Sequence, residues 1–195
     1  MTKLSKREHT RIRLIDSASK GFRRYGYFGF GVDALSKNAN VTSGAFYAHL
    51  KSKNNAFLLS LEKGLVEVID TIPIYQADYG LAWTREFAHY YLGLDHAKNI
   101  ETGCSLATLT LDIAREEAFQ DEKFASHMNT IIALIKQGLA GDDKDSRAWG
   151  YLSVLVGGIN FVRALPSEQL KHDTSEALIS SACTIAGKTQ LAQSQ

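Results

Sequence analysis

The sequence predicts an all-α protein. Apolar residues recur at intervals of three and four along most of the 195-residue chain, the spacing that places them on one face of a helix. The chain has only two prolines, Pro73 and Pro166, so few positions interrupt a helix. No segment has the character of a convincing strand. We therefore expect an all-α architecture of about nine helices.

Four of these helices are expected before Pro73. The first carries an apolar stripe at Ile12, Ile15, Ala18 and Phe22 and ends near Gly26, because glycine is common just past a helix end. Two short helices, 32–38 and 43–49, follow it. A long helix then carries Leu58, Leu61, Leu65, Val68 and Ile72. We expect it to stop before Pro73, since the residue preceding a proline disfavours the helical conformation.

Five more helices are expected in the rest of the chain. Helical spacing predicts them at about 81–96, 104–116, 124–139 and 149–165, the fourth stopping near Pro166. The last has Leu178, Ala182 and Ile185 on its inner face, and Asp173 or Thr174 is its expected N-cap.

Charge is distributed unevenly along the chain. Residues 1–63 hold 12 Lys and Arg against 4 Asp and Glu, whereas residues 64–195 hold 10 against 17. A basic front on an acidic remainder indicates a nucleic acid or a membrane surface as partner. The polar N-terminus does not resemble a secretory signal, no apolar run has the length of a membrane span, and two cysteines form no disulfide framework. We expect a cytoplasmic protein with reduced thiols.

The two short helices predict a helix-turn-helix unit. Asn40 lies in the turn, where a left-handed residue is often needed, and the Thr42 hydroxyl is the natural N-cap of the second helix. In such units the second helix enters the major groove of DNA. Phe46 and Leu50 are expected inside, whereas Tyr47 and His49 project outward.

Seven residues of this region are candidates for DNA contact. The missing side chain of Gly44 lets the helix backbone approach the duplex closely. Ser43 can bond a base edge, and the methyl group of Ala45 can meet a thymine methyl. Tyr47, His49 and the lysines that follow can bind phosphate oxygens. The candidates are Thr42, Ser43, Gly44, Ala45, Tyr47, His49 and Lys53, with Lys51 adding charge.

About a quarter of the chain also carries a recognisable pattern. It consists of Ile-x-x-Ala-x-x-x-Phe at 15–22, Gly-Tyr at 26–27, Val-Asp-Ala-Leu at 32–35, Ala-Asn-Val-Thr-Ser-Gly-Ala-Phe-Tyr-Ala-His-Leu at 39–50 and Lys-Ser-Lys at 51–53. This pattern resembles the TetR family of transcriptional regulators. The resemblance implies a three-helix DNA-binding domain and a helical C-terminal domain that dimerises and often binds a small effector. It places the family's phosphate contacts on Tyr47, His49 and Lys53, and its base-reading positions on Ser43 and Ala45.

The sequence departs from the family pattern at several positions. Phe30 and Gly31 stand where Thr or Ser is common, which removes a hydroxyl cap and a phosphate contact. Gly21 replaces a usual leucine and leaves a gap that a neighbour must fill. Asn40 replaces a common glycine and Asn54 a common glutamate. The Gly-Cys-x-Leu-Ala run at 103–107 resembles only a subset of the family.

We therefore expect a DNA-binding domain at 1–52 and an effector-binding and dimerisation domain at 53–195. The expected partners are a palindromic double-stranded DNA operator, a second copy of the chain and an unidentified small-molecule effector. The dimer contacts are expected on the last two helices, at Trp149, Leu152, Val156, Gly157, Leu178 and Ala182. Aromatic and polar residues are candidates for the effector site: Trp83, His89, Tyr90, Cys104, His127 and Asn160.

Other functions remain as alternatives. A regulator of the same fold could sense redox state through Cys104, and a helical interaction module could use the basic front without binding DNA. The sequence contains no phosphate-binding glycine loop, nucleophile elbow or paired metal-ligand motif. We accordingly expect no enzyme activity, no cofactor and no metal. Repression is the expected mode of regulation.

Overall fold

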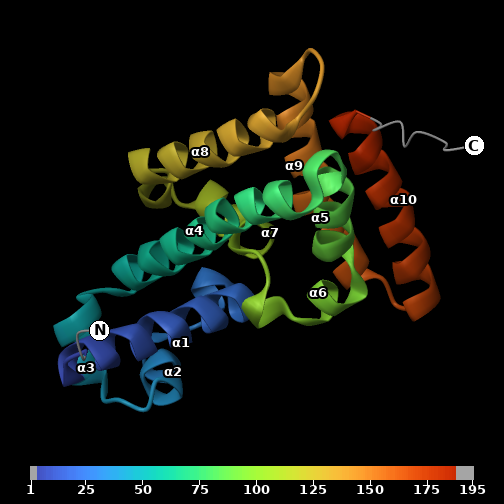
Figure 1. Cartoon of the computed structure of the whole chain (residues 1–195). Coiled ribbons are helices and arrows are strands. Elements are labelled where there is room, and N and C mark those ends of the chain that lie inside the picture. Colours follow the sequence, from blue (N-terminus) through green and yellow to red (C-terminus); the bar gives the residue numbers. More distant parts are fainter. Residues whose placement is uncertain (1–3, 188–195) are drawn as a thin grey trace, which may run out of the picture. The chain divides into compact units, whose positions relative to one another are not determined.

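A computed structural model of the chain describes residues 4–187 (Figure 1). All regular structure among these residues is helical, which confirms the expected all-α fold. The chain divides into two compact units. Unit 1 comprises residues 4–66 and Ile100–Phe124; unit 2 comprises Glu67–Asn99 and residues 125–187.

Unit 1 contains α1 (Lys6–Gly29), α2 (Val32–Asn38), α3 (Ser43–Leu50), the first part of α4 (Lys53–Tyr79) and α7 (Ser105–Arg115). Short 3-10 turns lie at Ile100–Thr102 and Glu117–Phe119. Unit 2 contains the end of α4, a 3-10 turn at Gly80–Ala82, and the helices α5 (Trp83–Leu92), α6 (Leu94–Lys98), most of α8 (Glu122–Gly138), α9 (Lys144–Ala164) and α10 (Glu168–Ala186).

Helix α1 begins with a capping box. The Ser5 hydroxyl accepts a hydrogen bond from the Glu8 backbone N–H, and the Glu8 carboxylate accepts one from the Ser5 N–H at 2.7 Å. The Glu8 carboxylate also accepts a hydrogen bond from the Ser5 hydroxyl, and this bond and the one from the Ser5 N–H lower the pKa of Glu8. At the other end, Gly26 has φ +70° and interrupts the helical backbone, a conformation that suits glycine. The expected end at Gly26 is therefore a kink, after which one more turn follows.

The buried face of α1 differs in part from the expected stripe. Leu14, Ala18 and Phe22 are fully buried, while Ile12 is 44% exposed. The expected stripe was wrong at its start. Ala18 and Phe22 also continue a four-residue spacing that begins at Leu14, and this second stripe is the one that is buried. Phe22 packs against the rings of Phe30 and Phe57, which lie 5.7 and 5.4 Å away between centroids.

The kinked end of α1 is held by residues that come much later in the chain. The Asp112 carboxylate of α7 accepts a hydrogen bond from the Tyr27 backbone N–H at 3.0 Å. The buried Arg23 guanidinium donates to the Ser105 hydroxyl, also at 3.0 Å. Because α2 and α3 follow directly from this end, α7 helps to fix where they begin.

Helix α4 does not stop before Pro73, as the sequence predicted, but continues to Tyr79. A proline inside a helix removes one hydrogen bond and costs about 3 kcal/mol. Packing of the following turn within unit 2 offsets that cost. Ile72 is fully buried, Gln76 donates from its side-chain amide to the Leu134 carbonyl at 2.7 Å, and Tyr75 contacts the ring of Phe87.

Two further boundaries in unit 2 differ from expectation. The single helix expected over 81–96 is broken at Gly93, whose extended backbone separates α5 from α6. Helix α10 is capped by Ser167, whose hydroxyl accepts from the Leu170 N–H at 3.2 Å, and not by Asp173 or Thr174. The Ser167 hydroxyl satisfies a free N–H at the start of α10, so the helix begins six residues before the expected cap at Asp173.

Two buried aromatic residues in the core of unit 2, Trp83 and Tyr151, have hydrogen-bonded polar atoms. The Trp83 indole N–H donates to the Gly138 carbonyl at 2.8 Å, and the Tyr151 hydroxyl donates to the Thr84 carbonyl at 2.6 Å. Burial raises the pKa of Tyr151 well above its ordinary value. No helix within residues 4–187 is long and apolar enough to span a membrane.

Candidate nucleic-acid interface

Helices α2 and α3 form the expected pair joined by a tight turn. Asn40 has φ +54°, in the left-handed region predicted for this position. The N–H of Asn40 donates to the Lys37 carbonyl and that of Val41 donates to the Ser36 carbonyl, both at 3.0 Å. These bonds satisfy the end of α2 and turn the chain into α3. Figure 1 shows both short helices beside α1.

The N-terminus of α3 is capped as predicted. Thr42 has an extended backbone, and its hydroxyl accepts a hydrogen bond from the Ala45 N–H at 3.2 Å. Phe46 and Leu50 are fully buried, which confirms the predicted inner face. Tyr47 is 54% exposed, and its ring meets that of Phe46 edge to face. The helix is therefore anchored by two apolar residues and presents the tyrosine outward.

Gly44 is exposed and has space around it. A Cβ added there would have only the Thr42 hydroxyl within 4 Å, at 3.8 Å. Packing inside the chain therefore does not require a glycine at this position. Glycine costs up to about 1 kcal/mol relative to alanine in a helix. The use of glycine is explained if an external partner approaches the backbone of α3 closely.

Ser43 has a partner that the sequence analysis did not foresee. Its hydroxyl donates to the Asp33 carboxylate of α2 at 2.9 Å. This bond fixes the rotamer of Ser43 and leaves the hydroxyl oxygen free to accept from a base amino group. Asp33 is thus a positioning residue for a candidate base contact. Ala45, the second such candidate, is partly exposed one helical turn before His49.

Lys53 lies at the start of α4 and packs on an aromatic face. Its ammonium nitrogen lies 4.4 Å from the ring centroid of Tyr27, a cation–π distance. Burial lowers the pKa of Lys53, and Asp112 opposes that shift. The Tyr27 hydroxyl in turn donates to the Asn54 side-chain carbonyl. The lysine therefore has a defined position and not a freely rotating one.

The departures from the family pattern have structural consequences in the same region. Gly31 is the N-cap of α2 and supplies no side-chain hydrogen bond, as expected. The gap at Gly21 is filled by Phe30, because a Cβ on Gly21 would lie only 2.0 Å from a ring carbon of Phe30. At a position where Thr or Ser is common in the family pattern, this chain therefore has a phenylalanine that is buried in the core, with 3% of its surface exposed.

Four residues have roles at this surface that were not predicted from the sequence: Asp33, Tyr27, Phe30 and Asn55. The Asn55 side-chain amide donates to the Leu50 carbonyl at 2.9 Å and so closes the C-terminus of α3. Only Asn55 could have been found from the sequence, as a short amide shortly after a helix end. The other three act through contacts between separate helices.

The six candidate effector residues are distributed over both units. Cys104 belongs to unit 1, where it is the N-cap residue of α7. The other five belong to unit 2: Trp83, His89 and Tyr90 on α5, His127 on α8 and Asn160 on α9. Trp83 is 1% exposed, whereas Tyr90 is 52% exposed and stacks on His96. Cys183, the second cysteine, lies in unit 2, and burial raises its pKa.

The candidate dimer residues fall into two groups. Trp149 is 47% exposed, and Val156, Gly157 and Leu178 are partly exposed. Leu152 and Ala182 are buried within the chain, so they can only support such a surface from beneath. A Cβ on Gly157 would have no atom within 4 Å, whereas one on Gly158 would lie 3.0 Å from Leu178. Gly158 thus serves packing inside the chain, and Gly157 faces open space.

No family model matches the sequence, and no curated protein matches it significantly. Solved structures do match its fold. A TetR-family transcriptional regulator from Agrobacterium tumefaciens superposes with a TM-score of 0.74 at 15% identity, covering 90% of this chain and 98% of the other.

Two further structures give the same result. The reduced form of NemR from E. coli has a TM-score of 0.74 at 17% identity, with 90% and 96% of the two chains covered. A TetR-family regulator from Cytophaga hutchinsonii has a TM-score of 0.72 at 19% identity, with 94% and 98% covered. The chain therefore has the fold of the TetR-family transcriptional regulators.

Proposed function

We propose that this protein is a member of the TetR family and acts as a homodimeric DNA-binding transcriptional repressor. The observation that carries the proposal is the capped helix α3, which is anchored by Phe46 and Leu50 while exposing Gly44 and Tyr47. Its glycine has no role in packing within the chain. The basic balance of residues 1–63 supplies the charge that DNA binding requires.

In this proposal α3 enters the major groove with its N-terminal turn toward the bases. Ser43, held by Asp33, and Ala45 contact base edges, and Gly44 lets the backbone approach. Thr42, Tyr47, His49 and Lys53 contact phosphates on either side of the groove. The two classes of residue have different consequences when they are changed, because phosphates carry no sequence information.

The division of roles can be tested by selecting preferred duplexes from a random pool and measuring their affinities. Tyr47→Phe should lower affinity for all duplexes by about thirtyfold, since one hydrogen bond of about 1 kcal/mol is lost in each of two subunits. Ser43→Ala should change the selected sequence. Tyr47 is exposed, so its variant should melt like the wild-type protein and provide the folding control.

The same selection distinguishes the alternatives. If wild-type protein binds no duplex at any salt concentration but associates with anionic vesicles, the interaction-module alternative replaces DNA binding. If Tyr47→Phe and Ser43→Ala both leave affinity and preference unchanged, α3 does not face DNA.

The dimer is proposed to form through the exposed side of α9, where Trp149, Val156 and Gly157 share one face, with Leu178 of α10 beside it. A two-fold dimer is the commonest homo-oligomer and places two copies of α3 on the two halves of a palindrome. Gly157 allows a partner helix to approach this face closely.

Gly157→Glu tests this surface. We expect a monomer by sedimentation velocity and at least a hundredfold loss in duplex affinity, because two carboxylates would be buried close to the two-fold axis. The monomer should melt normally, since the added side chain meets no atom within 4 Å. Ala133→Glu on the exposed face of α8 is the matched control. A Gly157→Glu protein that stays dimeric places the interface elsewhere.

We propose that a small-molecule effector binds unit 2 near Trp83, His89, Tyr90, His127 and Asn160 and shifts the population away from the DNA-binding state. Aromatic rings with a few polar groups support this location. The redox alternative rests on Cys104, and neither Cys104 nor Cys183 forms a disulfide within residues 4–187.

A further inference from the structure

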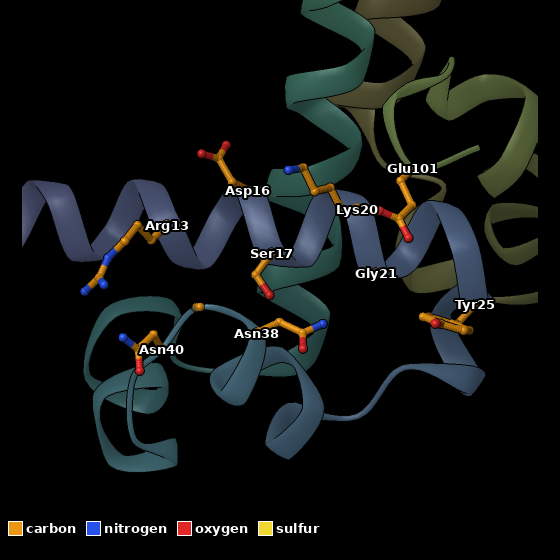
Figure 2. A pocket seen from close by; sticks show the side chains of 10 residues that line it. Arg13, Asp16, Ser17, Lys20, Gly21, Tyr25, Asn38, Asn40 and Glu101 are labelled. Atoms are coloured by element: carbon orange, nitrogen blue, oxygen red, sulfur yellow. The ribbon is translucent and has the colours of Figure 1, made fainter. Parts of the chain in front are cut away.

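Unit 1 contains a groove that none of the candidate DNA contacts lines. It has a volume of about 370 Å³ and lies between α1 and the end of α2 with the turn that follows. Its polar lining comes from Arg13, Asp16, Lys20, Asn38, Asn40 and Glu101. Figure 2 shows Arg13 and Asn40 at one end of the groove and Glu101 toward the other.

The two acidic residues of the groove are neutralised by cations outside it. Asp16 accepts from the Lys63 ammonium at 2.5 Å, and Glu101 accepts from the Arg24 guanidinium at 2.9 Å. Arg13 and Lys20 are both exposed, and neither forms an ion pair with any residue in the described range 4–187. The groove therefore holds two positive charges that are not balanced locally.

The spacing of these two cations suits an extended anion. They are seven residues apart on α1, so their backbone positions lie on the same face, about 10.5 Å apart along the helix axis. Figure 2 shows that the Arg13 side chain extends toward Asn40, whereas the Lys20 side chain extends to the other side of α1, as Asp16 does. The side-chain amides of Asn38 and Asn40 add donors from the opposite wall. Neither amide has a hydrogen-bond partner among residues 4–187. Two cations and two amides form a donor-rich set that matches phosphate oxygens.

We propose that this groove binds a phosphate-bearing ligand through Arg13, Lys20, Asn38 and Asn40. Its position gives the site a consequence for DNA binding, because Asn40 lies two residues before Thr42, the N-cap of α3. The phosphates can belong to a DNA strand beside the major groove or to a free diphosphate-type molecule that enters between α1 and the turn. The DNA source depends on the proposed function, whereas the free source does not.

The two sources are distinguished with two probes. In the first arm, free protein is titrated with pyrophosphate while the amide resonances of Gly21, Asn38, Ala39 and Asn40 are followed by NMR. In the second arm, affinity for a 20-base-pair duplex of random sequence is measured between low and moderate salt. Shifts confined to these residues with pyrophosphate identify a free ligand. A smaller salt slope in the groove variants than in wild type identifies DNA phosphates.

Three variants make the arms decisive. Arg13→Gln with Lys20→Gln should abolish the pyrophosphate shifts or reduce the magnitude of the salt slope by about 2 to 4 for the dimer. Arg7→Gln with Arg115→Gln removes the same charge from exposed positions of unit 1 outside the groove and should change the slope by less. Asn40→Gly deletes the amide while keeping a residue suited to φ +54°, so it should weaken binding at least threefold without unfolding the turn.

The proposal is overturned if pyrophosphate produces no localised shifts and the two charge variants have the same salt slope. It is also overturned if Asn40→Gly binds both probes like the wild type. Wild-type protein that binds pyrophosphate in the groove but no duplex would support the site and refute the DNA-binding function, so the two failures can be told apart.

Discussion

Replacing Gly44 with leucine will make the protein slightly more stable and will nearly abolish its binding to DNA. The site is exposed, and a Cβ there would meet only the Thr42 hydroxyl, at 3.8 Å, beyond its own helix backbone, so a larger side chain is accommodated in the free protein. Leucine also gains up to about 1 kcal/mol of helix propensity over glycine. In the complex, the same side chain occupies the space between α3 and the base pairs. A loss of about 1.4 kcal/mol or more in each of two subunits corresponds to at least a hundredfold weaker binding.

The measurement pairs thermal melting with affinity for the duplex selected by the wild-type protein. Ala133→Leu, an exposed helical site on α8, provides the control for a general effect of added apolar surface. Misfolding would lower both the thermal stability and the DNA affinity. A rise in stability together with a loss of affinity therefore cannot result from misfolding. Undiminished affinity of the Gly44→Leu protein would show that α3 does not approach DNA through its first turn.

The second large effect concerns Gly21 and Phe30, which share one space in the core of unit 1. Phe30→Ala should destabilise the protein by about 3 to 5 kcal/mol, since a buried ring is replaced by a cavity. Gly21→Leu should cost about 2 kcal/mol or more, because its Cβ would lie within 2.4 Å of three ring carbons of Phe30. Each substitution alone is therefore strongly destabilising.

Together the two substitutions should compensate in part. The leucine can fill the space that the ring leaves, so the double variant should be at least about 1 kcal/mol more stable than the sum of the single effects predicts. Urea unfolding of the four proteins in this cycle measures the coupling. Additive effects within about 0.3 kcal/mol would show that Phe30 does not occupy the gap left by Gly21.

Local sequence rules predicted the parts of α2 and α3 that depend on neighbours in the chain. The Thr42 cap was predicted because its hydroxyl can reach an N–H at the start of the helix. The left-handed turn at Asn40 was predicted because Asn tolerates positive φ. The buried pair Phe46 and Leu50 was predicted from their four-residue spacing. These features are decided by backbone geometry within about one helical turn, so they can be inferred before the fold is known.

The features that the sequence did not reveal depend on contacts between distant segments. Pro73 remains inside α4 because packing in unit 2 outweighs a local penalty. Lys53 is positioned by the ring of Tyr27, Ser43 by Asp33, and the start of α2 by Asp112 through Tyr27. No local pattern specifies which helices meet, so these side chains acquire their roles only once unit 1 is folded.

The same limit applies to the effector and dimer residues. Gly157 and its neighbour Gly158 both lie within α9, but a Cβ on Gly158 would contact Leu178 whereas one on Gly157 would have no atom within 4 Å. Cys104 and Trp83 were both predicted to line the effector site, as members of a set of aromatic and polar residues, but they belong to different units. Residues of similar type in a sequence can therefore lie in quite different environments in the folded protein.

The central claim is that the face of α3 bearing Gly44 and Tyr47 lies in the major groove as one of a symmetric pair. The most direct measurement is the protein's affinity for a duplex taken from the DNA upstream of its own gene, at salt concentrations from about 50 to 200 mM. We expect the logarithm of the binding constant to fall linearly with the logarithm of salt, with a slope of magnitude about 4 or more for a dimer, and Gly44→Leu to remove the preference for that duplex over random DNA. A binding constant that does not change with salt, or an unaltered preference in the Gly44→Leu protein, would contradict the account.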